Sequence, residues 1–222
     1  TLVYSTTFAD SERLVKAIHH TLKNPEAFPA LHATFGPFVV RGTETEFAVF
    51  SRLGEPLGSQ YAAKSFGGSG RGHLYRSKRP SKVTMDDIVH PQHVLSATQR
   101  EKDWEFLNKD ILKSGDTYTR YRMLNTVQHA DDTTSRALKD PAWVVTKWQA
   151  LISWPSNVAL WEQCRLIWIN LANPKRNHDA WAFYLRNPGD MDAGARVLWP
   201  EGRPLFDLMK AFWSNPASFY SE

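Results

Sequence analysis

The sequence feature that most constrains the fold is a short apolar strand that ends in two adjacent acids. Residues 82–85 have the pattern of a strand, and Asp86 and Asp87 follow it directly. A strand buried in a parallel sheet has its carboxyl end at the crevice where ligands bind. An acid there can hold Mg²⁺ while the metal bridges phosphates, and a second acid can accept a proton from water. The alternative is an acidic pair that only ends a strand at the surface.

The turn after this strand decides whether the two acids can share one site. Adjacent residues on an extended strand point to opposite faces of the sheet. Asp87 can therefore lie beside the Asp86 carboxylate only if the strand has ended and the chain is turning. Residues 88–91, Ile-Val-His-Pro, permit such a turn.

Strand and helix patterns alternate around the acids. Four more segments have strand patterns: 1–5, 38–40, 47–50 and 118–124. A first helix is expected from a cap at Asp10 or Ser11, ending at Asn24-Pro25, with an apolar face formed by Leu14, Ile18 and Leu22. A second helix is expected from the capping pair Ser96 and Gln99, with Trp104, Leu107 and Ile111 on its apolar face. A polar turn is expected at 129–132.

A glycine-rich, basic segment covers residues 66–79. Its four glycines predict a flexible or tightly turning loop. Its cations are candidates for contacts to DNA or to a neighbouring subunit's nucleotide: Arg71, Arg76, Lys78 and Arg79. The alternative is a solvated surface loop.

The last third of the chain is rich in tryptophan. Eight of the nine tryptophans lie from Trp143 to Trp213. Helices are expected from Ser156, over 178–186 and over 204–213, the first with Leu160, Cys164, Ile167, Trp168 and Leu171 on one side. Such a density of aromatic side chains favours a packed aromatic core over a surface on which bases stack.

Composition excludes some classes of protein. The net charge of +4 permits an anionic partner without requiring one. No apolar run approaches the roughly 18 residues that a membrane span needs, so no membrane is expected as a partner. The single cysteine, Cys164, cannot form an intramolecular disulfide and is expected to pack in a core. The eight histidines are scattered and do not have the paired spacing of a zinc site.

Five segments together resemble the large terminase subunit of tailed bacteriophages, a DNA-packaging ATPase and nuclease. Residues 79–88 are similar to its Walker B segment, an Arg-Pro-Asp lead-in followed by an apolar strand and an acidic pair. Residues 99–102 resemble the helix that often follows, and residues 125–132 resemble the Gly-Thr-x-x-His-x-x-Asp coupling segment. Residues 191–201 and 204–222 are similar to the end of the ATPase region, just before the nuclease domain.

The resemblance covers nearly the whole chain and implies a fold and roles. The fold is an α/β, RecA-like (ASCE) P-loop NTPase sheet, parallel with flanking helices, followed by a mainly helical subdomain. Asp86 would position Mg²⁺, Asp87 would orient or deprotonate the hydrolytic water, and Thr126 would couple ATP hydrolysis to movement. The implied partners are double-stranded DNA, the small terminase subunit and the portal of the procapsid, in a homo-oligomeric ring in the host cytoplasm.

The chain departs from the family pattern at three places. Ser81 stands where the family often has an acid, and Asn125 replaces the glycine before Thr126. No G-x-x-x-x-G-K-[ST] segment occurs, so the Walker A loop that cradles the phosphates is absent from these 222 residues. The glycines at 67–72 are no substitute, because no Lys-Ser or Lys-Thr pair closes them.

These departures predict a middle piece of the longer protein. Residues 1–135 would form the later part of the ATPase core, and residues 136–222 a helical lid or linker before a nuclease domain. The chain alone is expected to lack appreciable ATPase activity and to have an exposed sheet edge. Two alternatives remain: a non-enzymatic module that binds DNA or protein, and a metal-dependent hydrolase that uses Asp86, Asp87, Asp131 and Asp132.

Overall fold

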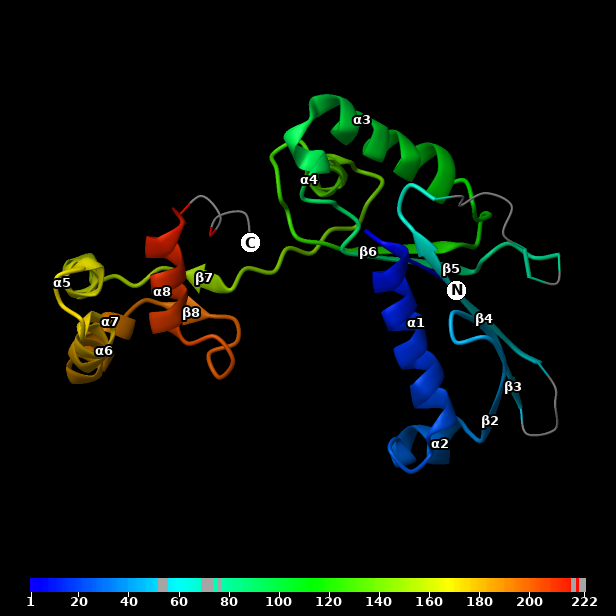
Figure 1. Cartoon of the computed structure of the whole chain (residues 1–222), viewed down its shortest axis with the longest axis horizontal. Coiled ribbons are helices and arrows are strands. Elements are labelled where there is room, and N and C mark those ends of the chain that lie inside the picture. Colours follow the sequence, from blue (N-terminus) through cyan, green and yellow to red (C-terminus); the bar gives the residue numbers. More distant parts are fainter. Residues whose placement is uncertain (52–55, 69–73, 76, 217–218, 220–222) are drawn as a thin grey trace. The chain divides into compact units, whose positions relative to one another are not determined.

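The computed structural model describes residues 1–51, 56–68, 74–75, 77–216 and 219 (Figure 1). The chain divides into two compact units, Thr1–Trp143 (unit 1) and Val144–Glu222 (unit 2). Each unit is described by itself. Within the described residues, no helix combines the length and the apolar character that crossing a membrane would require.

Unit 1 is an α/β unit. Its elements in chain order are β1 (Leu2–Ser5), α1 (Phe8–Lys23), α2 (Pro29–Phe35), β2 (Phe38–Gly42), β3 (Glu46–Ser51), β4 (Pro56–Ser65), β5 (Lys82–Asp86), the 3-10 helix η1 (His93–Leu95), α3 (Ala97–Phe106), the π-helical turn η2 (Leu107–Ile111), β6 (Arg120–Leu124) and α4 (Thr133–Lys139).

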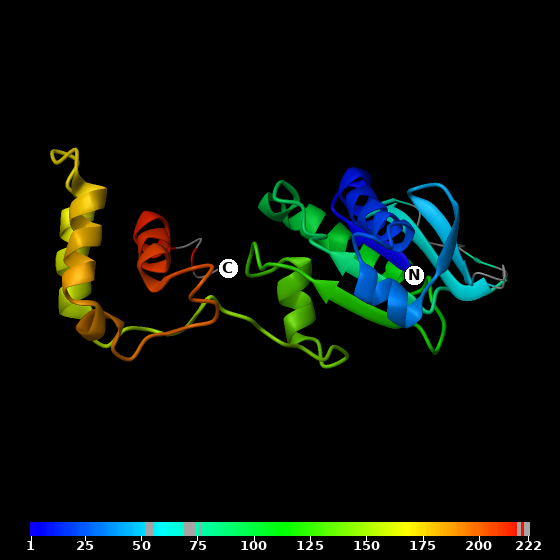
Figure 2. The ribbon, with the colours of Figure 1, turned by 90° about the horizontal axis from the view of Figure 1, so that it is seen from below.

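A six-stranded sheet organises unit 1, in the order β2-β3-β4-β1-β5-β6. The four strands β4, β1, β5 and β6 are parallel to one another, whereas β3 runs antiparallel to both β2 and β4. The predicted α/β fold with flanking helices is thus confirmed, and the sheet is mostly rather than wholly parallel. Among the described strands, β6 (green in Figure 2) lies at one edge of the sheet and β2 at the other.

Helices cover the two faces of this sheet unevenly. Figure 1 shows α1 and α3 on opposite sides of the strands. On the α3 side, one buried cluster is formed by Leu2, Tyr4, Ala62, Val83, Met85, Ile88, Leu107 and Ile111. On the α1 side, a second is formed by Val3, Val15, Phe47, Val49 and Ala63. Beyond α1, the same face of β6 remains exposed at Arg120, Arg122 and Leu124.

The first helix differs from the expectation in its start and its buried face. Its cap is Thr7, whose hydroxyl oxygen accepts from the Asp10 N–H at 3.2 Å, rather than Asp10 or Ser11. Its fully buried stripe passes through Ser11 and Val15, whereas Leu14 is exposed. Ile18 and Leu22 of the predicted face are partly buried and pack against the α1-side cluster, so the prediction of the face is wrong only at Leu14. The end of the helix before Asn24 is as predicted.

Two further expectations hold in unit 1, and several elements were missed. Ser96 caps α3 by accepting from the Gln99 N–H at 3.4 Å, and β6 occupies most of the predicted strand at 118–124. The ten-residue strand β4, the helices α2 and α4 and the 3-10 helix η1 were not predicted from the sequence.

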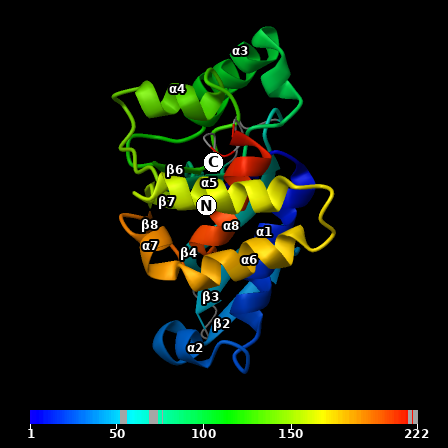
Figure 3. The same cartoon turned by 90° about the vertical axis from the view of Figure 1, so that its left-hand side faces the viewer.

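Unit 2 is mainly helical. Its elements are β7 (Leu151–Ser153), α5 (Val158–Ile169), α6 (Arg176–Arg186), α7 (Pro188–Asp192), β8 (Arg196–Val197) and α8 (Leu205–Ser214), with β7 and β8 paired antiparallel. In Figure 3, α5 and α6 lie side by side.

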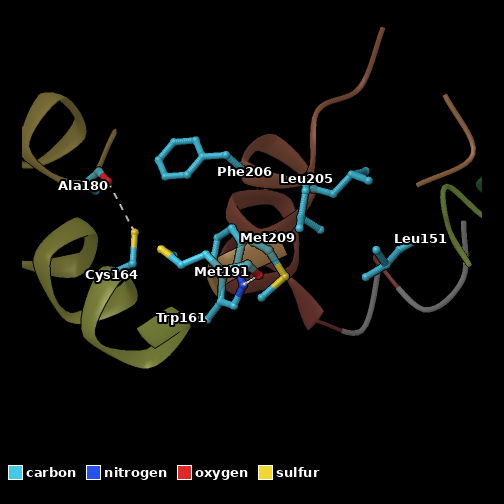
Figure 4. Packing of buried hydrophobic residues seen from close by; sticks show 9 residues of the cluster. Leu151, Trp161, Cys164, Ala180, Met191, Leu205, Phe206 and Met209 are labelled. Carbon is cyan, nitrogen blue, oxygen red and sulfur yellow. Dashed lines mark hydrogen bonds between the residues drawn. The ribbon is translucent and has the colours of Figure 1, made fainter. Parts of the chain in front are cut away.

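Aromatic and sulfur-containing side chains fill the core of unit 2. Figure 4 shows Cys164 of α5 facing Ala180 of α6, and the Trp161 indole N–H donating to the Met191 carbonyl oxygen at 2.7 Å. Ring contacts join this centre to the other helices, such as Trp161 with Trp213 at a centroid distance of 6.0 Å. Cys164 is fully buried, which raises the pKa of its thiol to about 11. The predicted packing roles of Cys164 and of these tryptophans are confirmed.

The predicted start and one predicted face residue of α5 are wrong. Asn157 caps the helix by accepting from the Leu160 N–H, while the Ser156 hydroxyl donates to the Ala193 carbonyl oxygen. Leu171 lies beyond the end of the helix and is exposed.

Candidate functional site

The carboxyl ends of β1 and β5 meet at one cavity. These strands are parallel neighbours, so Ser5 and Asp86 end at the same edge of the sheet. A cavity of about 300 Å³ opens there, lined by Ser5, Thr6, Asp10, Arg13, Leu14, Asp86 and Asp87. Both acids of the predicted site therefore reach one space, together with the first turns of α1.

Asp87 has a left-handed backbone conformation. Its φ is +47°, one of two positive values among the non-glycine residues that the structure describes. Aspartate tolerates this region better than most residues, yet it costs energy. This turn redirects the chain after the strand, so that the Asp87 side chain is exposed at the cavity while Ile88 and Val89 enter the core. The condition set by the sequence, that the strand must end between the two acids, is met.

Both neighbouring strands hold Asp87 in this conformation. The Asp87 N–H donates to the Leu124 carbonyl oxygen of β6 at 2.9 Å. Its carbonyl oxygen accepts from the Thr6 N–H at 3.3 Å and from the Thr6 hydroxyl. Because three strands meet at these bonds, the position of Asp87 depends on the ends of β1 and β6 together.

The cavity favours a cation beside Asp86. Partial burial raises the pKa of the Asp86 carboxyl, and the adjacent Asp87 charge raises it further. A positive ion beside a carboxylate favours its charged form. Carboxylate oxygens are also the ligands that Mg²⁺ prefers. The residues present therefore fit a divalent cation.

Arg13 supplies the cavity with a positive charge. It extends from the first turns of α1 and forms an ion pair with Asp10 one turn earlier. Asp10 in turn accepts from the Thr7 hydroxyl at 2.5 Å, which lowers the pKa of its carboxyl. A guanidinium group in a cavity with carboxylates is suited to an anionic ligand that also binds a metal.

Comparisons with known proteins identify no relative that would assign a function to this cavity. No protein-family model matches the sequence, and no curated protein matches it either. The arrangement on its own can bind a cation at Asp86, offer a proton acceptor at Asp87 and contact an anion through Arg13.

Residues 125–132, the segment expected to couple hydrolysis to movement, follow β6 at the carboxyl ends of the parallel strands. Thr126 is exposed and lies two residues after the strand ends. Asn125, in the place of the family's glycine, is half-buried, and its side-chain oxygen accepts from the Ile88 N–H at 2.8 Å. The residue that departs from the family pattern thus contacts the turn that carries the acids.

The basic segment lies partly outside the described residues. Arg71 and Arg76 fall among the residues that the structure does not describe. Lys78 is exposed, and the Arg79 guanidinium donates to the Ser114 carbonyl oxygen at 3.3 Å. Both precede the amino end of β5, whereas Asp86 is at its carboxyl end.

Asp131 and Asp132 do not join Asp86 and Asp87 in a metal site. Within the part of the chain that the structure describes, no group of three or more His, Cys, Asp or Glu residues could hold a metal ion. Asp132 is buried and accepts from three backbone N–H groups at the start of α4. Asp131 accepts from the Arg136 and Arg100 guanidinium groups. The described residues therefore do not support the alternative of a hydrolase in which Asp86, Asp87, Asp131 and Asp132 share a metal site.

Sequence reasoning missed Thr6, Asp10 and Arg13. The available signal was their position, because they directly follow the strand 1–5. Residues after the carboxyl ends of parallel strands collect at one edge of a sheet. That β1 and β5 are neighbours, however, follows only from the strand order.

Proposed function

We propose that this chain carries the Walker B part of a nucleotide-hydrolysing motor of the terminase large-subunit type. The observation that carries the proposal is that Asp86 and Asp87 line one cavity, because the chain turns at Asp87, which has a left-handed backbone conformation. In this proposal Asp86 holds Mg²⁺ and Asp87 accepts the proton of the attacking water. Bound Mg²⁺ would neutralise charge on the phosphates of ATP.

Other residues have supporting roles in the proposal. Arg13 contacts a phosphate oxygen from the α1 side of the cavity. Thr126, exposed after β6, links hydrolysis to movement, as the resemblance implies. The partners are those of a DNA-packaging motor: double-stranded DNA, a small terminase subunit, a portal and further copies of the chain in a ring, in the host cytoplasm.

The outer side of β6 could pair with a further strand that carries a phosphate-binding loop. Among the described residues, β6 pairs only with β5. If a parallel strand lay beside β6 and led into β1 through a helix, that connection would run across the sheet in the same direction as the connection from β1 to β4. Parallel crossovers are right-handed, so its helix would lie on the α1 side. That is the side on which Arg122 and Leu124 of β6 are exposed.

The chain alone is expected to be inactive on ATP. It has no G-x-x-x-x-G-K-[ST] loop, and therefore no backbone N–H cradle or lysine for the β- and γ-phosphates. The proposal predicts such a loop in the gene segment directly upstream of Thr1. Its absence there would favour the binding module.

Metal binding tests the site directly. Mn²⁺, used as a paramagnetic substitute for Mg²⁺, is titrated into the 222-residue chain and followed by electron paramagnetic resonance. Binding is expected for the wild type and is lost in Asp86→Asn, which keeps the size of the side chain. The control Asp207→Asn removes an exposed acid of α8 and should leave binding unchanged. Equal binding by the wild type and Asp86→Asn contradicts the proposal.

A second measurement concerns the incomplete site. The wild-type chain is expected to show no Mg²⁺-dependent ATP turnover. Turnover that disappears in Asp86→Ala would contradict the expected inactivity of the chain alone, but not the assignment of Asp86.

A cationic face supports one alternative function, a module that binds DNA. Lys82, Arg120 and Arg122 lie on the same face of β5 and β6, and Lys82 is directly opposite Arg120. Like charges in this register repel unless an anion lies between them. DNA binding that weakens steeply with salt, is lost in Arg120→Ala/Arg122→Ala and is unchanged in Asp86→Ala would favour this alternative.

A further inference from the structure

Two side chains from the segment after β6 hold the turn that follows Asp87. The Asn125 side-chain oxygen accepts from the Ile88 N–H at 2.8 Å. The Gln128 side-chain amide donates to the Val89 carbonyl oxygen at 3.0 Å. Ile88 and Val89, which follow Asp87, are thus each hydrogen-bonded to a side chain of the segment after β6.

Asn125 and Gln128 are also hydrogen-bonded to the start of α4. The Asn125 amide donates to the Thr134 hydroxyl oxygen at 3.0 Å. The Gln128 backbone N–H donates to the Asp132 carboxylate at 2.7 Å. Asp132 caps α4 by accepting from the Ser135 N–H at 2.6 Å. A displacement of the turn at Ile88 would therefore pull on the first turn of α4.

The residues at both ends of these bonds are buried. Ile88 and Val89 are buried on one side of the connection, and Thr134 and Asp132 are buried on the other. Asn125 and Gln128 lie between them and are half-buried, so their bonds are partly shielded from solvent. A lost partner would leave a polar group of a buried residue unsatisfied.

The connection continues from α4 to α3. Asp131, next to the cap, binds the guanidinium groups of both Arg136 on α4 and Arg100 on α3. Arg136 also forms an ion pair with Glu101 of α3 at 2.6 Å. A change at the turn after Asp87 thus has a continuous bonded path to the outer helices of unit 1.

We propose that Asn125 and Gln128 are positioning residues that couple the state of the Asp86-Asp87 turn to α4. The inference rests on the proposed function, in which that turn holds the metal and the hydrolytic base. Asn125 is central, because a glycine in its place could make neither the bond to Ile88 nor the bond to Thr134. The departure from the family pattern therefore adds a link that glycine could not provide.

A thermodynamic cycle measured by amide hydrogen exchange tests the coupling without any ligand. Asp87→Gly perturbs the turn, and the exchange of the α4 amides is compared with and without Asn125→Gly. Asp87→Gly is expected to change α4 exchange by about fivefold when Asn125 is present and by clearly less when it is combined with Asn125→Gly, because only the Gln128 connection then remains. Equal changes in both backgrounds would overturn the proposal.

A second variant separates the link from general loss of structure. Thr134→Val keeps the shape of the side chain and removes the acceptor for the Asn125 amide. Protection of the Ile88 amide should remain in Thr134→Val and fall roughly tenfold in Asn125→Gly, because only the latter loses the acceptor of Ile88. Both variants should reduce the response of α4, which then depends on the Gln128 connection alone. Asn170→Gly, at the end of α5, is the matched control and should change neither quantity.

Mg²⁺ titration distinguishes this inference from the proposed function. In the wild type, Mg²⁺ should shift the amide resonances of Asp86, Asp87 and the α4 residues. In Asn125→Gly the shifts at Asp86 and Asp87 should remain and those at α4 should become clearly smaller. No shift at Asp86 and Asp87 in the wild type contradicts the metal site, while the exchange cycle still decides the coupling. Shifts at α4 that are undiminished in Asn125→Gly would overturn the coupling and leave the metal site intact.

Discussion

The two units bury different kinds of residue. All the buried polar or charged residues among those the structure describes belong to unit 1: Ser5, Ser11, His19, Asp103, Ser114, Asp132, Thr133, Thr134 and Ser135. The buried cluster of unit 2 consists of apolar residues, with a tryptophan, a cysteine and two methionines among them. Burying a polar group is unfavourable unless it is hydrogen-bonded. Unit 1 therefore adds buried hydrogen-bonded groups to its two apolar clusters, whereas the buried cluster of unit 2 is apolar.

This difference predicts different responses to substitution. In unit 2, removing a side chain removes contact area, and the cost follows the volume that is lost. In unit 1, the cost follows the number of polar groups left without a partner. Substitutions in each unit can therefore test whether the contrast holds.

The largest effect is expected for Trp161→Ala in unit 2. Trp161 is 2% exposed, contacts the Tyr184 and Trp213 rings and donates to the Met191 carbonyl oxygen. Its removal should lower the free energy of unfolding of unit 2 by about 3–5 kcal/mol, as for other large core truncations. Urea denaturation, with hydrogen exchange assigning the loss to each unit, measures this.

The control for this substitution is Trp199→Ala. Trp199 is 63% exposed, so its removal should cost less than about 1 kcal/mol. Protection of the β1 and β5 amides should be unchanged in Trp161→Ala. An equal loss of protection in both units would show that their stabilities are not separate.

The next largest effect is expected for Asp132→Ala in unit 1. The Asp132 carboxylate accepts from the N–H groups of Gln128, His129 and Ser135, and it is buried. Alanine leaves these donors unsatisfied, so the free energy of unfolding should fall by about 2–3 kcal/mol. Urea denaturation, with hydrogen exchange of the α3 amides assigning the loss to unit 1, measures this.

A matched comparison separates polarity from volume. Val15→Ala removes a fully buried apolar side chain of unit 1 that makes no side-chain hydrogen bond. Asp132→Ala should cost at least as much, although neither leaves a large cavity. A clearly smaller loss for Asp132→Ala would contradict the view that bonding dominates at this edge of unit 1.

The sequence was informative where apolar pattern and position coincide. The strand 82–85 and the acids after it could be predicted, because a run that fits a buried strand is interrupted by two charges. β4 was missed, because Ser59 and Gln60 give it no apolar alternation and it becomes a strand through pairing with β1 and β3. α4 was missed because its first residues, Thr-Thr-Ser, have low helix propensity, and the helix depends on the buried cap at Asp132.

The site itself required information that is not local. The left-handed conformation of Asp87 results from bonds to Thr6 and Leu124, which lie far from it in the sequence. The presence of Arg13 in the cavity depends on the adjacency of β1 and β5. The pattern at the end of a strand can indicate an acidic pair. Which arginine lies beside that pair, and which residues hydrogen-bond to its backbone, depends on the order of the strands in the sheet.

A smaller effect of opposite sign is expected for Asp87→Gly. Glycine adopts positive φ without steric cost, and the substitution also removes the charge that raises the pKa of Asp86. The free energy of unfolding should rise by roughly 0.5–1 kcal/mol, although the site loses its proton acceptor. Asp87→Asn removes only the charge and should gain less. A variant Asp87→Gly that is less stable than Asp87→Asn would show that the turn is not strained.

The smallest effect concerns the pH dependence of the ion pairs between α3 and α4. Hydrogen bonds from Arg136, followed by those from Arg100, lower the pKa of Asp131 to about 2. A carboxyl whose pKa is depressed by folding adds stability above its unfolded value of about 3.9 and loses it as the pH falls toward 2. The wild type should therefore have a slightly higher melting temperature than Asp131→Asn at pH 7, and the gap should close between about pH 4 and pH 2. Solvent and salt screen this exposed pair, so the gap should also shrink in about 1 M NaCl.

Glu162→Gln in unit 2 is the matched control, because its Arg165 partner lies on the same helix and joins no second element. Its gap should be smaller at every pH, and a larger gap would place the ionic contribution in the unit that otherwise relies on packing.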